Sequence, residues 1–322
     1  MKTVAVAFEA PPPARALITA TVGGLGRAWF LGDPGFLEAL PNAEILLVRG
    51  WRKEFPPGTL AGMRRVEVMQ CLFTGVEHLP WEEIPPSAIV CTNAGAQAEA
   101  VAEHAMALLL AAAKRVPEHD AAMRLGGFHQ DWVGRRLAGM TLGILGHGEI
   151  GRHVARMAKG FSMRVLALNR RGAGREHVDV ALGPDGLDRL RRECDVLVCC
   201  LPLTKHTAGM IDGPFLAALK EDAILVNISR GKVVDEAALY AHLRSHPAFI
   251  AALDVWWRYP KQEKERPFEH PFHELPNVVM TPHVAFAVPD NGPRILAHAM
   301  ENVLRHLRGE ALENVADSRD YR

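Results

Sequence analysis

The sequence predicts an α/β protein of two domains, each built on a doubly wound parallel sheet. The first observation is length, because 322 residues exceed what one hydrophobic core usually holds. The second is an alternation of short, continuously apolar segments with helical ones, which is typical of parallel strands covered by helices. The third is a hydrophobic fraction of 48%, which is enough for well-packed globular domains.

The apolar segments predicted as strands fall into two series along the chain. Each is a short run bounded by polar or turn-forming residues, the pattern of a strand buried on both faces. The first series lies in residues 1–94, which with residues 290–322 are expected to form one domain. The second lies in residues 95–289, the expected second domain. The predicted strands are 3–9, 43–50, 64–72 and 87–93, followed by 140–146, 163–169, 195–201, 223–229, 249–255 and 277–283.

Two long helices and one long loop are predicted between and after these strands. Residues 96–116 are rich in alanine and leucine and contain no glycine or proline, so they predict a helix buried on most sides. Residues 293–310 predict an amphipathic helix that ends at Gly309. Residues 258–276 are polar and proline-rich, which predicts a loop of functional length.

Charge and composition exclude several classes of protein. Acidic and basic residues balance at 37 each, so no overall field attracts nucleic acid or an anionic membrane. The first residues resemble no signal peptide, and no apolar run approaches the roughly 20 residues of a membrane span. The cysteines are odd in number and form no C-x-x-C pair, so we expect a cytoplasmic protein with reduced thiols and no metal site. They are Cys71, Cys91, Cys194, Cys199 and Cys200.

A glycine-rich turn follows the predicted strand 140–146. Gly146, Gly148 and Gly151 match G-x-G-x-x-G between a strand and a helix, which is the context that dinucleotide binding requires. The first glycine permits the tight turn, the second lets a pyrophosphate approach, and the third lets helix and strand pack closely. The backbone amides near Glu149 and Ile150 are expected to face the phosphates.

The residues after the next predicted strand bear on the choice of cofactor. Asn169 occupies the position where an acidic residue usually holds the adenosine ribose 2′-hydroxyl of NAD(H). An amide does not repel a 2′-phosphate, and Arg170 and Arg171 can donate charge-assisted hydrogen bonds to one. The sequence therefore favours NADP(H), with NAD(H) possible. The alternative is that both arginines belong to a solvated loop.

Several spaced motifs occur over nearly the whole chain, namely VAEHAMALLLAAAKR, TLGILGHGEIG, CLPLTKHTAGMI, VNISRGKVVDEAAL, ALDV and TPHVA. They resemble those of the D-isomer-specific 2-hydroxyacid dehydrogenases. The resemblance implies a Rossmann dinucleotide-binding domain inserted in a flavodoxin-like substrate domain. It also implies a homodimer, with the helix near 96–116 and its flanks at the interface. The implied reaction interconverts a 2-keto acid and a D-2-hydroxy acid of the glyoxylate or hydroxypyruvate type.

The resemblance also assigns expected roles to individual residues. Arg230 is the expected clamp for the substrate carboxylate and carbonyl, because its guanidinium offers donors in a rigid fork. His283 is the expected acid–base, since an imidazole can protonate the nascent alkoxide. His104 also matches the family pattern, and we expect it to serve in helix packing. Further expected contacts are with the cofactor at Leu201, Pro202, Thr207, Ile228 and Asp254, and with the substrate carboxylate at Thr74, Gly75 and Val76.

One position departs from the family pattern. The acid expected to pair with the histidine is replaced by Tyr259. Either Tyr259 supports His283 by a neutral hydrogen bond, or Glu263, Glu265 or Glu269 folds back to it. Without a carboxylate beside it, the protonated form of His283 is less stabilised, so reduction is expected to decline as pH rises. The missing acid leaves open a low-turnover nucleotide-sensing protein, and the same fold also serves dehydrogenases of small anions such as formate or phosphite.

Overall fold

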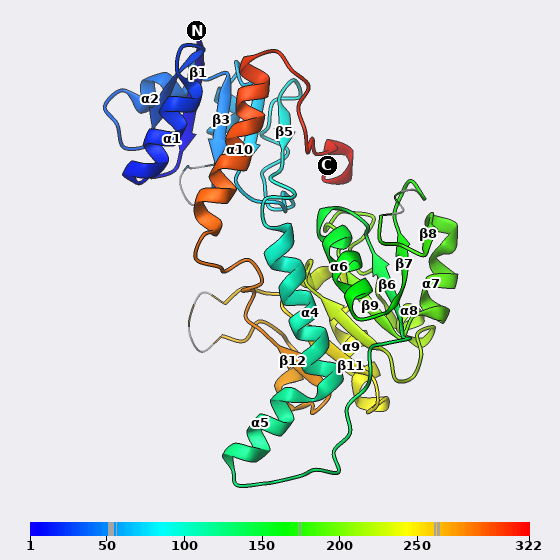
Figure 1. The fold of residues 1–322 in the computed structure, drawn as a ribbon. Helices are drawn as coiled ribbons and strands as arrows, with labels where there is room; N and C mark the ends of the chain where they lie inside the picture. The colour runs from blue at the N-terminus through cyan, green and yellow to red at the C-terminus, as the bar shows by residue number, and fades with distance from the viewer. Residues whose placement is uncertain (51–54, 56, 173, 175, 261, 263–264) are drawn as a thin grey trace. The chain divides into compact units, whose positions relative to one another are not determined.

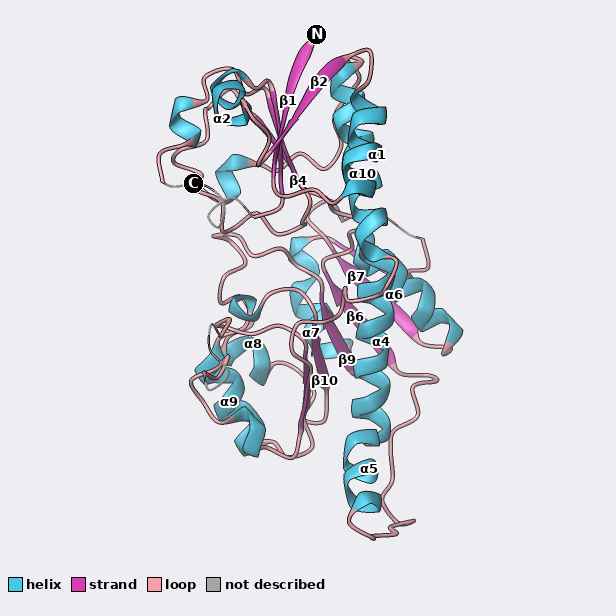
Figure 2. Ribbon diagram, turned by 90° about the vertical axis from the view of Figure 1, so that its left-hand side faces the viewer, coloured by secondary structure: helices cyan, strands magenta, loops and turns pink. Residues whose placement is uncertain are grey.

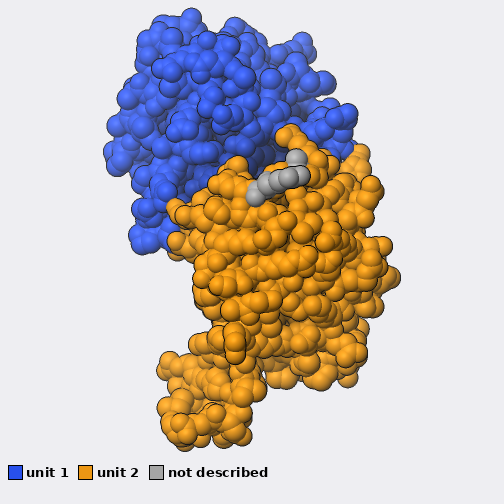
Figure 3. All heavy atoms as spheres, turned by 45° about the vertical axis from the view of Figure 1, so that its right-hand side comes forward, with its two compact units in different colours: residues 1–97, 288–322 blue, residues 98–287 orange. Residues whose placement is uncertain are grey.

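The computed structural model describes the whole chain except residues 51–54, 56, 173, 175, 261 and 263–264. The chain forms two compact units, shown in different colours in Figure 3. Unit 1 comprises residues 1–97 and 288–322, and unit 2 comprises residues 98–287. Unit 2 is thus one continuous segment, whereas unit 1 is assembled from both ends of the chain. No helix among the described residues has the length and apolar character to span a membrane.

Unit 1 is built on a five-stranded parallel sheet with the order β2-β1-β3-β4-β5. This is the order of the flavodoxin-like doubly wound fold, so the predicted fold class is confirmed for this unit. The edge strand β2 was not among the predicted strands. The strands are β1 (Lys2–Ala7), β2 (Gly26–Phe30), β3 (Ile45–Val48), β4 (Val68–Cys71) and β5 (Ile89–Cys91).

Helices cover both faces of this sheet. On one face lie α1 (Pro12–Val22) and α10 (Asn291–Leu307), which appear on the same side of the strands in Figure 2. Ile18 of α1 and Leu296 of α10 share a buried core with strand residues such as Val6. The other face packs against α2 (Phe36–Ala39) and the loops between the strands.

Unit 2 is built on a seven-stranded parallel sheet, at the lower right of Figure 1, with the order β12-β11-β10-β9-β6-β7-β8. The stretch from β8 to β11 has the 3-2-1-4-5-6 order of the Rossmann fold, with β12 added at one edge. The predicted fold is therefore confirmed here too, although β8 was not predicted. The strands are β6 (Thr141–Leu145), β7 (Arg164–Leu168), β8 (Val180–Leu182), β9 (Val196–Cys199), β10 (Ile224–Asn227), β11 (Ile250–Leu253) and β12 (Val278–Met280).

Two layers of helices cover the sheet of unit 2. The face with α4 (Ala98–Lys114) and α6 (Glu149–Gly160) and the face with α7 (Leu187–Glu193), α8 (Gly213–Ala217) and α9 (Glu236–Ser245) each enclose a hydrophobic core. The helix predicted at 96–116 ends earlier than expected, at Lys114. Arg115 has a left-handed backbone, with φ of 54°, and a second helix, α5 (Val116–Arg124), starts after it with a proline in its first turn.

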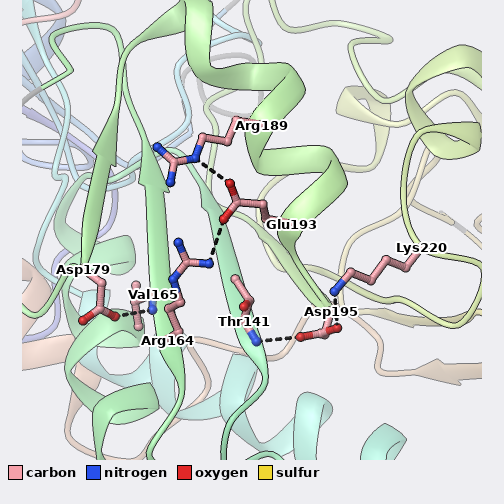
Figure 4. Close-up of polar contacts among 8 residues, drawn as sticks. All are labelled: Thr141, Arg164, Val165, Asp179, Arg189, Glu193, Asp195 and Lys220. Carbon is pink, nitrogen blue, oxygen red and sulfur yellow. Dashed lines mark hydrogen bonds and ion pairs between the residues drawn. The ribbon is translucent and has the colours of Figure 1, made fainter.

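Carboxylates tie the strands of unit 2 together at their amino ends (Figure 4). Asp195, just before β9, accepts hydrogen bonds from the Thr141 amide at 2.7 Å and from Lys220 at 2.6 Å. Asp179, just before β8, accepts from the Val165 amide at 2.6 Å and pairs with Lys159. That pairing lowers the pKa of Asp179. This edge of the sheet therefore stabilises the fold and leaves the opposite edge for a binding site.

Candidate functional site

The candidate site lies at the carboxyl ends of the parallel strands of unit 2. The glycine turn follows β6, Asn169 follows β7, Arg230 follows β10, Asp254 follows β11 and His283 follows β12. Because all neighbouring strands are parallel, these segments meet at one edge of the sheet. Ligands of open α/β sheets bind at this edge.

The glycine turn has the backbone that its motif requires. Gly146 has φ of +102°, and a Cβ on it would lie 3.0 Å from the carbonyl of Cys200. A Cβ on Gly151 would lie 2.5 Å from the Gly146 oxygen, so only glycine lets α6 start this close to β6. Gly148 precedes α6 and has no other group within 4 Å of its Cβ position. That open space and the amino end of α6 fit a dinucleotide pyrophosphate, and Glu149 and Ile150 form the first turn of α6 at this end.

Asn169 and the two arginines form a turn beside the glycine loop. The Asn169 side-chain oxygen accepts a hydrogen bond from the Arg171 amide at 2.9 Å, which closes the turn. Both arginine side chains, Arg170 and Arg171, are exposed. His147, between the first two glycines, lies near this turn, since its Nδ1 is 3.2 Å from the Cβ position of Gly174. Burial lowers the pKa of His147, and the charge of Arg152 lowers it further.

The remaining cofactor residues expected in unit 2 have two kinds of environment. Leu201 and Pro202 lie in the loop after β9, where Leu201 is half-buried and Pro202 exposed. The Thr207 hydroxyl donates to the Pro202 carbonyl at 2.6 Å and accepts from the Thr204 amide at 2.9 Å, so it shapes this loop. Ile228 is 5% exposed and belongs to the hydrophobic core.

Arg230 lies in a turn that neighbouring residues hold in place. The buried Asn227 side chain donates to the Arg230 carbonyl at 3.1 Å and accepts from the Ser229 amide at 3.1 Å. A Cβ on Gly231 would lie 2.2 Å from the backbone of Trp256, so this glycine lets the turn press against the chain after β11. Asn227 was not among the residues predicted for the site, although an amide at the end of a strongly apolar strand is a usable signal.

Asp254 and His283 belong to one hydrogen-bonded cluster. The fully buried Asp254 carboxylate accepts from the amides of Val284 at 2.9 Å and Ala285 at 3.0 Å, next to His283. His283 is half-buried and has a left-handed backbone, with φ of 59°. Asp254 was expected to face a nicotinamide amide; its contacts within the protein show that it holds this loop.

The structure brings Tyr259 into contact with His283. Their ring centroids are 5.2 Å apart with the planes inclined at 45°. Of the acids considered as alternatives, Glu269 pairs with Arg258, and Glu263 lies outside the described residues. Tyr259 is half exposed and borders a surface hollow of about 350 Å³, lined also by Arg258, Pro260, Glu265, Arg266 and Phe268.

The expected carboxylate-binding residues lie in unit 1, just after β4. Thr74 is exposed and Gly75 half-buried. Val76 is fully buried, and its carbonyl accepts a hydrogen bond from the Trp81 indole at 2.9 Å. That bond anchors the turn, so its backbone conformation is supported from within unit 1.

A family model and a known relative identify the family of this chain. A Rossmann sheet whose strands lead at their carboxyl ends into a glycine turn, an arginine and a histidine is the arrangement expected of a nucleotide-dependent oxidoreductase. The family model for the NAD-binding domain of D-isomer-specific 2-hydroxyacid dehydrogenases matches residues 106–285. A glyoxylate reductase of Korarchaeum cryptofilum is 38% identical over 251 residues, which are 76% of this chain and 74% of that protein.

Solved structures resemble the chain over its whole length. A D-isomer-specific 2-hydroxyacid dehydrogenase of Xanthobacter autotrophicus in complex with NADPH and MES is 27% identical, with a TM-score of 0.80, and covers 100% of this chain and 99% of its own. A Pyrobaculum aerophilum structure, described as that of a candidate formate dehydrogenase, is 33% identical with a TM-score of 0.83 and covers 100% of both chains. The chain belongs to the D-isomer-specific 2-hydroxyacid dehydrogenase family and is an NAD(P)-dependent oxidoreductase.

Proposed function

We propose that the protein reduces a small 2-keto acid, of the glyoxylate or hydroxypyruvate type, to the D-2-hydroxy acid with NADPH. The observation that carries this proposal is that Arg230 and His283 follow strands whose carboxyl ends share an edge with the glycine turn. The Korarchaeum glyoxylate reductase supports the substrate class. We further propose that unit 2 is the dinucleotide-binding domain and unit 1 the substrate domain.

The chain's own residues divide the chemistry as follows. Arg230 binds the carboxylate and polarises the ketone through its forked guanidinium, which stabilises negative charge on the carbonyl oxygen. His283 donates a proton to that oxygen and takes one in the reverse direction. The amides of Thr74, Gly75 and Val76 bind the substrate carboxylate. When bound, the nicotinamide supplies the hydride that reaches C2 of the substrate.

Cofactor choice follows from the turn after β7. Asn169 uses its side-chain oxygen within the turn and carries no charge that repels a 2′-phosphate. Arg170 and Arg171 are exposed on the same turn, where such a phosphate is expected. The Xanthobacter structure was solved with NADPH, which supports the same preference for NADP(H) over NAD(H).

Reductase activity is tested by following NADPH absorbance with glyoxylate and hydroxypyruvate. We expect turnover that Arg230→Ala reduces by roughly 10²- to 10³-fold, the loss typical of a transition-state charge donor. Arg192→Ala, which changes an exposed arginine of α7, serves as the control and should leave the rate unchanged. NADPH binding with no turnover of any keto acid would instead identify a nucleotide-sensing protein.

Cofactor preference is tested by measuring dissociation constants for NADPH and NADH. Arg170→Ala and Arg171→Ala should each weaken NADPH binding by roughly 10-fold or more, the worth of one charge-assisted hydrogen bond, and leave NADH binding nearly unchanged. Asn169→Asp should favour NADH. Equal affinities for both cofactors that no variant alters would overturn the NADP(H) preference.

One specific observation favours a second function. The Pyrobaculum structure, which is 33% identical to this chain, carries the formate description. Formate oxidation can be monitored through the reduction of NADP⁺ or NAD⁺ with formate as the substrate. Formate turnover that exceeds keto acid reduction under matched conditions would replace the first proposal with this one.

We also propose a homodimer in which the region around α4 and α5 meets a second copy. The segment from α5 to residue 133 extends beyond the sheet of unit 2 (Figure 1). It exposes large apolar side chains, which mark interaction surfaces when they gather. Leu125→Asp and Phe128→Asp should shift sedimentation toward the monomer, whereas Leu37→Asp in unit 1 should not. The exposed side chains are Val116, Met123, Leu125, Phe128 and Val133.

A further inference from the structure

The buried carboxylate of Asp254 accepts hydrogen bonds from donor groups of the chain itself. It is fully buried, and a buried carboxylate requires compensating hydrogen bonds. Oδ1 accepts from the Thr281 hydroxyl at 2.7 Å and from the Val284 amide at 2.9 Å. Oδ2 accepts from the Ala285 amide at 3.0 Å. Both oxygens of Asp254 therefore act on residues 281–285, the segment that carries His283.

This segment is held on both sides of His283. Before it, the Trp256 indole donates to the Thr281 carbonyl at 2.9 Å, and the Thr281 amide donates to the Leu253 carbonyl at 2.9 Å. After it come the two amides bound by Asp254. Between these contacts the backbone of His283 has a φ of 59°, a conformation that residues other than glycine rarely adopt. Such a conformation persists only where the surroundings impose it.

The imidazole of His104 reaches the same cluster from α4. Its Nε2 is 3.0 Å from the Thr281 hydroxyl and 3.4 Å from Oδ1 of Asp254. Since the single hydroxyl proton of Thr281 goes to Asp254, Nε2 of His104 must donate to Thr281. The order His104, Thr281, Asp254 then forms one directed chain of hydrogen bonds that ends on the amides after His283.

We propose that His104 and Asp254 are positioning residues that impose the left-handed backbone of His283 and so aim its imidazole. This inference rests on the proposed acid–base function of His283. It assigns His104 a part in the reaction beyond helix packing, and it makes Asp254 act first on the protein and not first on a nicotinamide amide. Neither residue needs to touch substrate for this purpose.

The test compares His104→Leu with His104→Gln in the full-length protein. Glutamine can place an amide donor near the former Nε2, whereas leucine cannot. Glu103→Gln, an exposed change at the neighbouring position of α4, is the matched control. The readouts are kcat and KM with glyoxylate and NADPH, the NADPH dissociation constant, and hydrogen exchange at the Val284 and Ala285 amides.

For His104→Leu we expect kcat to fall roughly 10- to 100-fold, because an angstrom of misplacement costs about this much. KM and the NADPH dissociation constant should stay within about threefold, and exchange at both amides should accelerate because the loop opens more often. His104→Gln should restore kcat and protection. Asp254→Asn should lower kcat more than it weakens NADPH binding.

Three results would overturn the inference. They are unchanged kcat with unchanged exchange in His104→Leu, failure of His104→Gln to differ from His104→Leu, or loss of NADPH binding as the main effect of Asp254→Asn. If the wild-type protein reduces no keto acid, the proposed function fails separately. The exchange comparison then still decides whether His104 holds the segment around His283.

Discussion

Gly231 has no side chain, and this allows the turn that carries the neighbouring Arg230. The turn that presents Arg230 packs so closely on Trp256 that any Cβ at position 231 would overlap the Trp256 backbone. The neighbouring Asn227 side chain holds the same turn from the other side. Backbone contact and a buried amide together fix the turn from which the Arg230 side chain extends.

We predict that Gly231→Ala destabilises the protein by on the order of 3 kcal/mol, because overpacking forces the backbone to move. It should also reduce activity by displacing Arg230. Urea unfolding and the keto acid assay measure the two effects. Gly160→Ala, at the end of α6 with no other group within 4 Å of its Cβ position, should be neutral or stabilising by about 0.5–1 kcal/mol. Equal effects of the two changes would contradict the packing argument.

His242 predicts a pH dependence of stability. It stacks on His246 with ring centroids 4.1 Å apart, and its Nε2 is buried with no hydrogen-bond partner among the described residues. Burial lowers the pKa of His242 from its ordinary value of 6.5, and the nearby charge of His246 lowers it further. Protonation is then easier in the unfolded state, so His242 contributes stability above about pH 6.5 that is lost as pH falls.

Accordingly, His242→Leu should gain stability relative to wild type as pH decreases from 7.5 to 5.5. The measurement is urea unfolding of both proteins at several pH values, compared as differences. His129→Leu, an exposed histidine change, is the control and should show no such trend. A difference between His242→Leu and wild type that is constant over this range would argue against the burial of an unpaired imidazole.

At the scale of elements, the two edges of the unit 2 sheet divide stability and function. At the amino edge, Asp195 links β6 to the segment that leads into β10, as Figure 4 shows. At the carboxyl edge, the strands end in the glycine turn and in the segments of Arg230 and His283. The amino and carboxyl ends of the parallel strands lie a full strand length apart, so changes at the amino ends should leave the site at the carboxyl ends intact.

Asp195→Ala should therefore destabilise the protein by about 1–3 kcal/mol, because the largely buried Thr141 loses the partner of its amide. The kcat and the KM should remain those of wild type at temperatures where the variant is folded. Asp188→Ala removes an exposed ion pair within α7 and should cost less than about 0.5 kcal/mol. A large loss of kcat in folded Asp195→Ala would refute the separation of the two edges.

At the scale of the whole molecule, the order of the chain through the two units has a consequence for folding. Residues 98–287 contain the complete sheet of unit 2 and both of its helix layers. Residues 1–97 contain every strand of unit 1 but lack α10, whose Leu296, Met300 and Val303 complete one of the two cores. Residues 98–287 thus supply the whole of unit 2, whereas residues 1–97 lack part of the core of unit 1.

We predict that a fragment of residues 98–287 folds cooperatively and binds NADPH, whereas a fragment of residues 1–97 does not fold. Circular dichroism, thermal unfolding and fluorescence titration with NADPH test this. Saturation at about 100 times the dissociation constant should stabilise the larger fragment by about 2.7 kcal/mol. A folded 1–97 fragment would show that α10 is dispensable for the core of unit 1.

The sequence by itself determined the interior strands, the glycine turn and the family. Continuous apolar runs report burial on both faces directly, and Gly146 and Gly151 stand where a Cβ would collide. The edge strands β2 and β8 escaped prediction because neither belongs to a long apolar run: Arg27 interrupts β2, and β8 directly follows Asp179. The end of α4 at Lys114 was predicted two residues late, and α5 was not predicted, since a proline such as Pro117 also indicates the end of a helix.

Only the tertiary structure decided what surrounds the candidate histidine. His104, Asp254 and His283 are far apart in the chain, and each has a polar side chain with an ordinary local context. Their association depends on α4, β11 and β12 packing together, which no local pattern encodes. Local periodicity specifies which residues are buried, whereas the partners of a buried carboxylate are chosen by the fold.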